Sequence, residues 1–137
     1  MAKNKTTDGK YVDGFVFVVS KKKLGEYIKM AQWGKELWMK HGALDYKECV
    51  GDDLQIKAMG GVKPLSFSKM AQAKAGETVC FSFIVFKSKQ HRDSVNAKVM
   101  KDPVMNDPKY KDMPMPFDMR RMAYGGFQVM VDGGNKI

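Results

Sequence analysis

Long apolar segments are missing from this chain of 137 residues. No run comes near the roughly 20 apolar residues that a membrane-spanning helix needs, so we expect no contact with a membrane. The first ten residues contain three lysines but no apolar core behind them, which argues against a secretory signal. We expect residues 1–10 to form a flexible basic tail and residues 11–137 to form a single domain with one core.

Cysteine is also scarce, because Cys49 and Cys80 are the two present. A small secreted domain that depends on disulfides would carry more cysteines and place them in loops. Both residues instead lie within apolar or alternating runs. This predicts two buried free thiols in a cytoplasmic protein, with a bridge between paired strands as the open alternative.

The motifs that would specify a particular chemistry are absent as well. The sequence has no P-loop, no dinucleotide fingerprint, no His-x-x-x-His pair, no nucleophile elbow and no Cys-x-x-Cys. His41 and His91 are far apart and have no partner at ligand spacing. We therefore expect neither a metal nor a cofactor.

Positive charge, in contrast, is plentiful. The formal net charge is +9, and residues 11–137 still carry +7 once the first ten residues are set aside. Such an excess attracts nucleic acid through a long-range field that salt screens. It also keeps a protein soluble, and the lysines are spread along the whole chain, so an association with RNA stays an alternative.

Four stretches have the patterns of strands. Residues 11–19 and 78–86 are apolar on both alternating sets, which is typical of strands covered on both faces. Residues 43–51 carry charge on both faces, as edge strands do. Residues 121–131 are the last predicted strand, and Gly125-Gly126 within it suggests a bulge.

Helical spacing of apolar residues covers residues 21–40, with Ser20 as the N-cap and Gly42 as the stop. A second helix is predicted from the cap Ser88 to about Met100.

The remaining segments are less regular. Asp102-Pro103 predicts a further short helix, because an N-cap is followed there by a proline at the first helical position. Residues 52–78 are the least defined, since Gly60-Gly61 interrupts them. Within them, residues 67–73 fit either a short strand or one or two helical turns.

This order of elements, βαββαβ, predicts a ferredoxin-like α+β fold. Its four-stranded antiparallel sheet would have the first and third strands in the centre and both helices on one face. The other face, which is also apolar, then needs a cover, and a second copy of the chain is the simplest one. We therefore expect a homodimer that pairs through the sheet face, as in a dimeric α+β barrel.

Spaced motifs along the chain also resemble a known family. In chain order they are Tyr11-Val12-Asp13-Gly14-Phe15, His41-Gly42-Ala43, Glu48-Cys49, Gly51-Asp52-Asp53, Phe81-Ser82-Phe83, Ser88-Lys89, Arg92-Asp93, Asn96, Met100, Asp102-Pro103, Met115-Pro116-Phe117-Asp118, Arg121-Met122 and Tyr124-Gly125-Gly126-Phe127. From residue 11 to about residue 129 the chain resembles the bacterial YbaA-like family of unknown function. The resemblance implies a cytoplasmic, homodimeric, ferredoxin-like subunit of the dimeric α+β barrel superfamily, and no established activity.

Polar side chains within apolar strands are the candidates for a site, because a charge inside a covered sheet is costly unless it is paired. One interpretation is that Asp13 or Asp118 pairs with Arg120 or Arg121 and fixes the strand register. The other is a polar cluster at one end of the barrel that serves a small-molecule pocket. The candidate pocket residues are Asp13, His41, Glu48, Ser82, Asp118, Arg121 and Tyr124.

Two further groups have competing interpretations. Lys21, Lys22 and Lys23 precede the first helix, where cations oppose the helix dipole, so they form either a candidate anion site or a solvated run of charge. Trp33, Trp38 and the 12 methionines are interpreted as packing in the core and the interface.

The function expected from these patterns is binding of a small organic molecule between the sheet and the helices of a homodimer. If the protein is an enzyme, analogy with the superfamily suggests cofactor-independent oxidation or isomerisation. The alternatives are a basic protein associated with nucleic acid, and a structural dimer without catalytic chemistry.

Overall fold

A computed structural model describes residues 9–134, and at its centre lies a four-stranded antiparallel sheet. The strands are β1 (Tyr11–Ser20), β2 (Asp45–Val50), β3 (Glu77–Phe86) and β4 (Ala123–Gln128). Their order across the sheet is β2-β3-β1-β4, so the first and third strands occupy the centre. The α+β class predicted from the sequence is therefore confirmed. Of the predicted tail, residues 1–8 lie outside the described residues.

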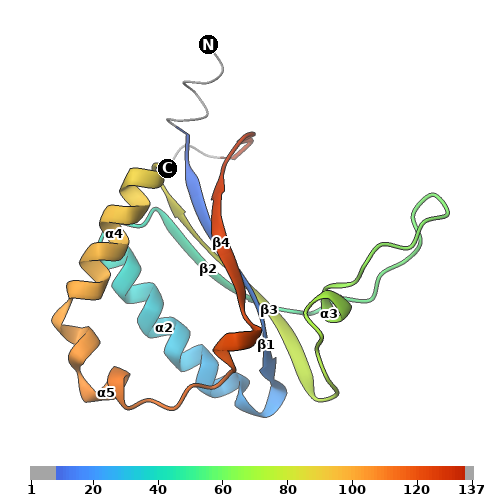
Figure 1. Cartoon of the computed structure of the whole chain (residues 1–137), viewed down its shortest axis with the longest axis horizontal. Coiled ribbons are helices and arrows are strands. Elements are labelled where there is room, and N and C mark those ends of the chain that lie inside the picture. Colours follow the sequence, from blue (N-terminus) through green and yellow to red (C-terminus); the bar gives the residue numbers. More distant parts are fainter. Residues whose placement is uncertain (1–8, 135–137) are drawn as a thin grey trace.

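Two long helices cover one face of the sheet, α2 (Leu24–Lys40) and α4 (Lys89–Lys101), as Figure 1 shows. After α4, the chain returns to β4 on the same side of the sheet (Figure 1). The shorter helices are η1 (Lys21–Lys23), α3 (Phe67–Met70), η2 (Pro103–Asn106), α5 (Pro108–Lys111) and η3 (Met119–Arg121). Within residues 9–134, no helix is long and apolar enough to cross a membrane.

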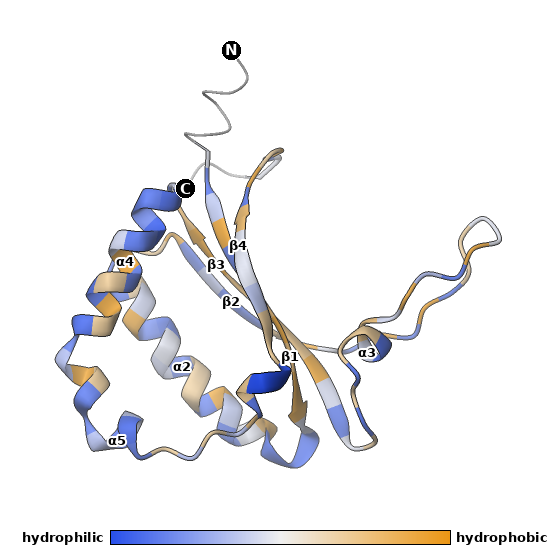
Figure 2. Cartoon of the chain, in the orientation of Figure 1, coloured by the Kyte–Doolittle hydropathy of each residue, from blue (hydrophilic) through white to orange (hydrophobic). Residues whose placement is uncertain are grey.

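The core lies between the sheet and these helices. Phe17 of β1 and Phe86 of β3 are fully buried there. Phe86 packs in one cluster with Val95 and Val99 of α4, and these two valines are the buried residues of a helix that is otherwise largely hydrophilic (Figure 2). Phe17 packs in a second cluster with Tyr27 of α2.

The opposite face of the sheet also carries apolar side chains, which are buried at one end, where Val18 and Val79 are each 3% exposed, and open to solvent elsewhere. Side chains alternate along a strand, so Val16 of β1 and Phe81 of β3, which pair with each other, point away from the core residues beside them. Phe81 is 45% exposed, and Phe127 of β4 is exposed beside Gly14 on the same face. We call this surface the open face, and define it by Val12, Val16, Phe81, Phe83 and Phe127.

A long excursion separates β2 from β3. We call residues 52–66 the arm; it projects away from the sheet and returns to α3 at its base (Figure 1). Gly60 and Gly61 turn the chain at its tip with φ angles of 57° and 81°, a region that favours glycine. Of the two structures predicted for residues 67–73, the helical turn is the one present.

Several cap predictions are confirmed and others are wrong. The Ser88 hydroxyl accepts a hydrogen bond from the His91 amide, and Asp102 accepts one from the Val104 amide. Ser20 makes no side-chain cap, because residues 21–23 form a 3₁₀ turn and α2 starts at Leu24.

The last predicted strand also needs correction, since β4 begins at Ala123 and Arg121 belongs to η3. The expected bulge is absent, because Gly125 and Gly126 pair one-to-one with Gly14 and Asp13. Gly126 serves close packing instead: a Cβ there would overlap the ring of Tyr11.

The two cysteines lie on opposite faces of the sheet and both are free thiols. Cys80 is buried toward the helices, whereas Cys49 pairs with Phe81 and is exposed on the other side. The prediction of two buried thiols is therefore wrong for Cys49. The alternation of side chains along paired strands also separates the two sulfur atoms.

We predict very different reactivity for these thiols. Burial and the nearby Glu48 charge raise the pKa of Cys80 to about 11. At pH 8 its thiolate fraction is then roughly 100-fold below that of an ordinary cysteine. At a dilution at which the chains are single subunits, labelling of Cys80 in a Cys49→Ser variant should be slower by at least that factor than labelling of Cys49 in a Cys80→Ala variant. Equal rates, or a disulfide found by mass analysis without reductant, would contradict the structure.

Candidate functional site

An apolar cavity of about 440 Å³ lies between the sheet and α2. Its walls come from the sheet, from α2 and from the segment that follows α4. The apolar side chains that line it include Phe15, Met30, Trp38, Ile84, Met105, Met115, Phe117, Met119 and Met122. The late methionines, which were interpreted as core packing, thus close one side of this cavity.

Glu48 of β2 brings a carboxylate to this apolar cavity. The Tyr27 hydroxyl of α2 donates a hydrogen bond to Glu48 Oε1 at 2.5 Å. The Tyr46 hydroxyl donates one to Glu48 Oε2 at 2.8 Å. Burial, together with the Glu48 charge, raises the pKa of both phenols far above its usual value, so both stay protonated donors.

Gly34 of α2 is required for this arrangement. A Cβ at Gly34 would lie only 2.6 Å from the Tyr46 hydroxyl oxygen. The absence of a side chain lets the phenol approach the helix backbone and reach Glu48. A glycine inside a helix costs about 1 kcal/mol relative to alanine, and here it makes room for a buried polar group.

Ser82 of β3 lies beside Glu48, because the two residues pair across neighbouring strands. Ser82 is buried and lines the cavity. Among residues 9–134, no group hydrogen-bonds its hydroxyl, so this donor and acceptor is free for a ligand. Each Glu48 oxygen also has a second lone pair beyond the one that a tyrosine uses.

A second hollow, of about 280 Å³, lies between α2 and β2. Its lining includes Leu24, Ile28, Val50 and Cys80. Tyr27 and Glu48 line both hollows, so their hydrogen bond stands in the wall between them.

Asp13, His41 and Tyr124, three predicted pocket residues, lie outside the cavity lining. Buried Asp13 accepts a hydrogen bond from Arg92 of α4 at 2.7 Å, a partner that the sequence reasoning did not consider. His41 contacts Asp102 at 2.7 Å. Tyr124 is exposed and stacks on Phe15 with ring centroids 5.8 Å apart. The contacts of Asp13 and His41 each join a helix to a neighbouring element.

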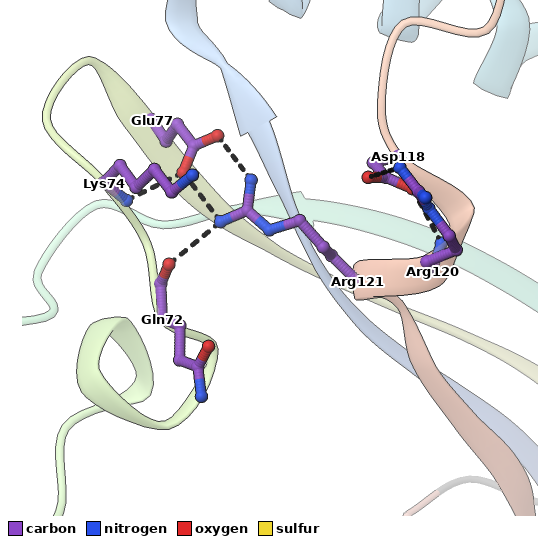
Figure 3. A network of polar contacts seen from close by, with 6 residues as sticks. All are labelled: Gln72, Lys74, Glu77, Asp118, Arg120 and Arg121. Carbon is purple, nitrogen blue, oxygen red and sulfur yellow. Dashed lines mark hydrogen bonds and ion pairs between the residues drawn. The ribbon is translucent and has the colours of Figure 1, made fainter.

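Asp118 and Arg121 are also placed away from the cavity lining. Asp118 accepts hydrogen bonds from both the backbone and the side chain of Arg120, which is one of the pairings considered from the sequence. Arg121 instead points to the base of the arm, as Figure 3 shows. It donates two hydrogen bonds to Glu77, at 2.7 and 2.9 Å, and one to the carbonyl of Gln72 at 2.9 Å.

The predicted anion site at Lys21, Lys22 and Lys23 has exposed side chains on a 3₁₀ turn. One of its backbone amides is engaged, because Lys21 N–H donates to the Gly76 carbonyl at 2.9 Å. Anion binding here, like association with nucleic acid, stays a prediction.

Of the predicted pocket residues, the cavity therefore brings together Glu48 and Ser82. Sequence reasoning missed the two tyrosines that hold the carboxylate. Tyr27 falls within the helix predicted for residues 21–40, and Tyr46 within the strand predicted for residues 43–51. The sequence did contain one signal for this contact: a charged residue, Glu48, in a predicted strand and a tyrosine, Tyr27, in a predicted helix that packs on the sheet.

The Glu77–Arg121 pair should make stability depend on pH in acid. Its hydrogen bonds lower the pKa of Glu77 from 4.5 to about 2. The stabilisation is therefore complete above pH 4.5 and is lost as pH falls toward 2. In urea unfolding, Glu77→Gln should be less stable than wild type at pH 6, and this difference should shrink at pH 3. The control is Asp112→Asn, at an exposed residue that forms no ion pair with the rest of residues 9–134. A stability difference for Glu77→Gln that stays constant between pH 6 and pH 3 would contradict the pairing.

Comparison with known proteins agrees with the resemblance noted above. Residues 10–119 match the family described as "Protein of unknown function (DUF1428)". The uncharacterized protein YbaA of Escherichia coli strain K12 is 40% identical over 123 residues, covering 90% of this chain and 98% of that protein. The protein of the same description from Shigella flexneri matches to the same extent. The chain thus belongs to the DUF1428 family of YbaA-like proteins of unknown function.

Proposed function

We propose that this protein binds a small, mostly apolar organic molecule that carries a hydrogen-bond donor. The observation that carries the proposal is a carboxylate, Glu48, held by two phenols at an otherwise apolar cavity. Ligand sites are commonly apolar hollows with a few well-placed polar groups. At about 440 Å³ the cavity has room for a molecule of two or three rings, since roughly 150 Å³ holds one benzene.

The polar groups define which ligand fits. Transfer of a carboxylate into apolar surroundings is costly, and further hydrogen bonds to it reduce that cost. Tyr27 and Tyr46 supply two, and a phenol, enol or N–H group on the ligand would supply a third. The free Ser82 hydroxyl beside Glu48 can accept or donate one more. A hydroxylated aromatic compound satisfies both conditions, apolar bulk and a donor at one end.

Binding is the role that this geometry supports best. Oxidation or isomerisation without a cofactor, which the superfamily analogy suggests, would use the same carboxylate as a base. Two phenols already donate to Glu48, and this favours orienting a ligand over removing a proton from it.

We also infer that the subunit is ferredoxin-like and pairs through its open face into a dimeric α+β barrel. Support comes from the order of elements and from the strand order β2-β3-β1-β4. Exposed phenylalanines on an uncovered sheet face give the same indication, because monomeric proteins rarely leave such a surface in water.

The binding proposal can be tested with two probes that differ by one hydroxyl, 1-naphthol and naphthalene. Wild-type protein should prefer 1-naphthol, and Glu48→Gln should reduce this preference about tenfold, because a charge-assisted hydrogen bond becomes a neutral one. Binding is measured by fluorescence titration. Glu36→Gln, on the exposed side of α2, should behave like wild type. Failure of both probes to bind would refute the cavity, and equal binding of both would refute recognition by the carboxylate.

The dimer has its own test. At 10–50 µM, light scattering should give about 31 kDa, twice the 15.5 kDa of one chain. Phe81→Asp should shift the protein to monomer, because it places a charge in the centre of the apolar interface. Met100→Asp, on α4 away from the sheet, should leave the mass unchanged. A wild-type protein that scatters as a monomer would overturn the dimer.

A further inference from the structure

We propose that the arm is a clasp that packs on a second copy of this chain, against the part of its open face that the paired sheets leave uncovered. The inference rests on the dimer proposed above and adds the element that completes its interface. The occupant is a second copy, and the residues involved are the apolar side chains of the arm.

The arm exposes large apolar side chains that nothing on its own subunit covers. Met59 is 72% exposed and Val62 is 67% exposed, and Leu65 is exposed further along. In Figure 2, apolar and hydrophilic residues alternate along its two limbs. Within residues 9–134, one isolated β-bridge, between Met59 and Val62, joins the two limbs of the arm. A hairpin of this kind is marginal alone in water, so it needs a surface to lie on.

The base of the arm is firmly held and adjoins the open face. Arg121 ties the end of the excursion to the body through Glu77 and the carbonyl of Gln72 (Figure 3). At the other end, the Leu54 side chain occupies the space that the missing side chain of Gly51 leaves free. Gly51 is two residues after Cys49, so the alternation of side chains places both on the side of the open face. The arm therefore leaves the sheet from that side.

The size of the open face leaves room for the arm to contribute to the contact. Four strands about 4.8 Å apart and six to ten residues long give a face on the order of 500 Å². A stable interface buries about 800 Å² on each partner. The 500 Å² is the flat outline of the face, and the exposed apolar side chains of the arm, Met59, Val62 and Leu65, add area of their own to the contact.

The reach of the arm fits this role. An extended limb of eight residues spans about 25 Å, whereas four strands span about 15 Å between the outer strand axes. The arm points away from its own sheet (Figure 1), so it cannot fold over its own open face without leaving this position. In a two-fold dimer each subunit offers an arm and receives one, which covers both surfaces at once.

Charge does not oppose this contact. Residues 52–66 contain two aspartates and two lysines, so the arm is neutral overall although the chain carries +9. Two copies can therefore exchange arms without adding to the repulsion between their basic bodies.

A matched pair of substitutions tests the clasp. Val62→Asp in the arm and Met100→Asp on α4 place the same charge at side chains that are both 67% exposed in one subunit. Val62→Asp should raise the dimer dissociation constant at least tenfold in sedimentation equilibrium, and Met100→Asp should leave it unchanged. Circular dichroism should show the same secondary structure for both variants, since neither residue packs in the core.

A photo-crosslinking amino acid at Met59 identifies what the arm contacts. Irradiation of the purified dimer should give a product of twice the chain mass, with the crosslink on peptides that contain Phe81 or Phe127 of the other copy. A crosslink within one chain would overturn the clasp. A dimer that Phe81→Asp disrupts and Val62→Asp does not would overturn the clasp and keep the dimer. A monomeric wild type would overturn both.

Discussion

The pairing of β1 with β3 is the contact on which the rest of this structure depends. Ten residue pairs join the two strands, and both carry apolar side chains on both faces. One face is covered by α2 and α4, and the core forms there. The other face has the same apolar character, and Phe81 at its centre is 45% exposed. The proposed dimer and the proposed clasp both follow from this unequal cover, because apolar surface on a central pair of strands has to be removed from water.

The cavity follows from a different constraint, the cost of a charge near the core. Glu48 lies on an edge strand but points toward the helices, where Tyr27 and Tyr46 approach it from two elements. Hydrogen bonds to both oxygens reduce the desolvation cost of the carboxylate. Tolerance of the charge and the proposed recognition of a ligand thus depend on the same hydrogen bonds.

Much of the fold could be predicted from the sequence because alternation and helical spacing report burial directly. The double-sided apolar character of residues 11–19 and 78–86 identified the two central strands. Ser88 and Asp102 identified helix starts, since their side chains bond the backbone locally. The site was harder, because its contacts join distant segments. Asp13 was recognised as a costly charge, but its partner, Arg92, lies 79 positions away. Arg121 was placed in a strand and proves to hold the base of the arm.

Gly34 sets the distance between two layers of the molecule. At most positions that distance is determined by the bulk of side chains that interlock and can readjust. Here the Tyr46 phenol oxygen meets bare helix backbone, so one rigid ring acts as a spacer between α2 and the sheet. The separation at this level is therefore fixed by the length of a tyrosine. The cavity beside it is thus held open on one side by a rigid tyrosine ring, whereas its other wall consists largely of methionines, whose unbranched side chains can change shape.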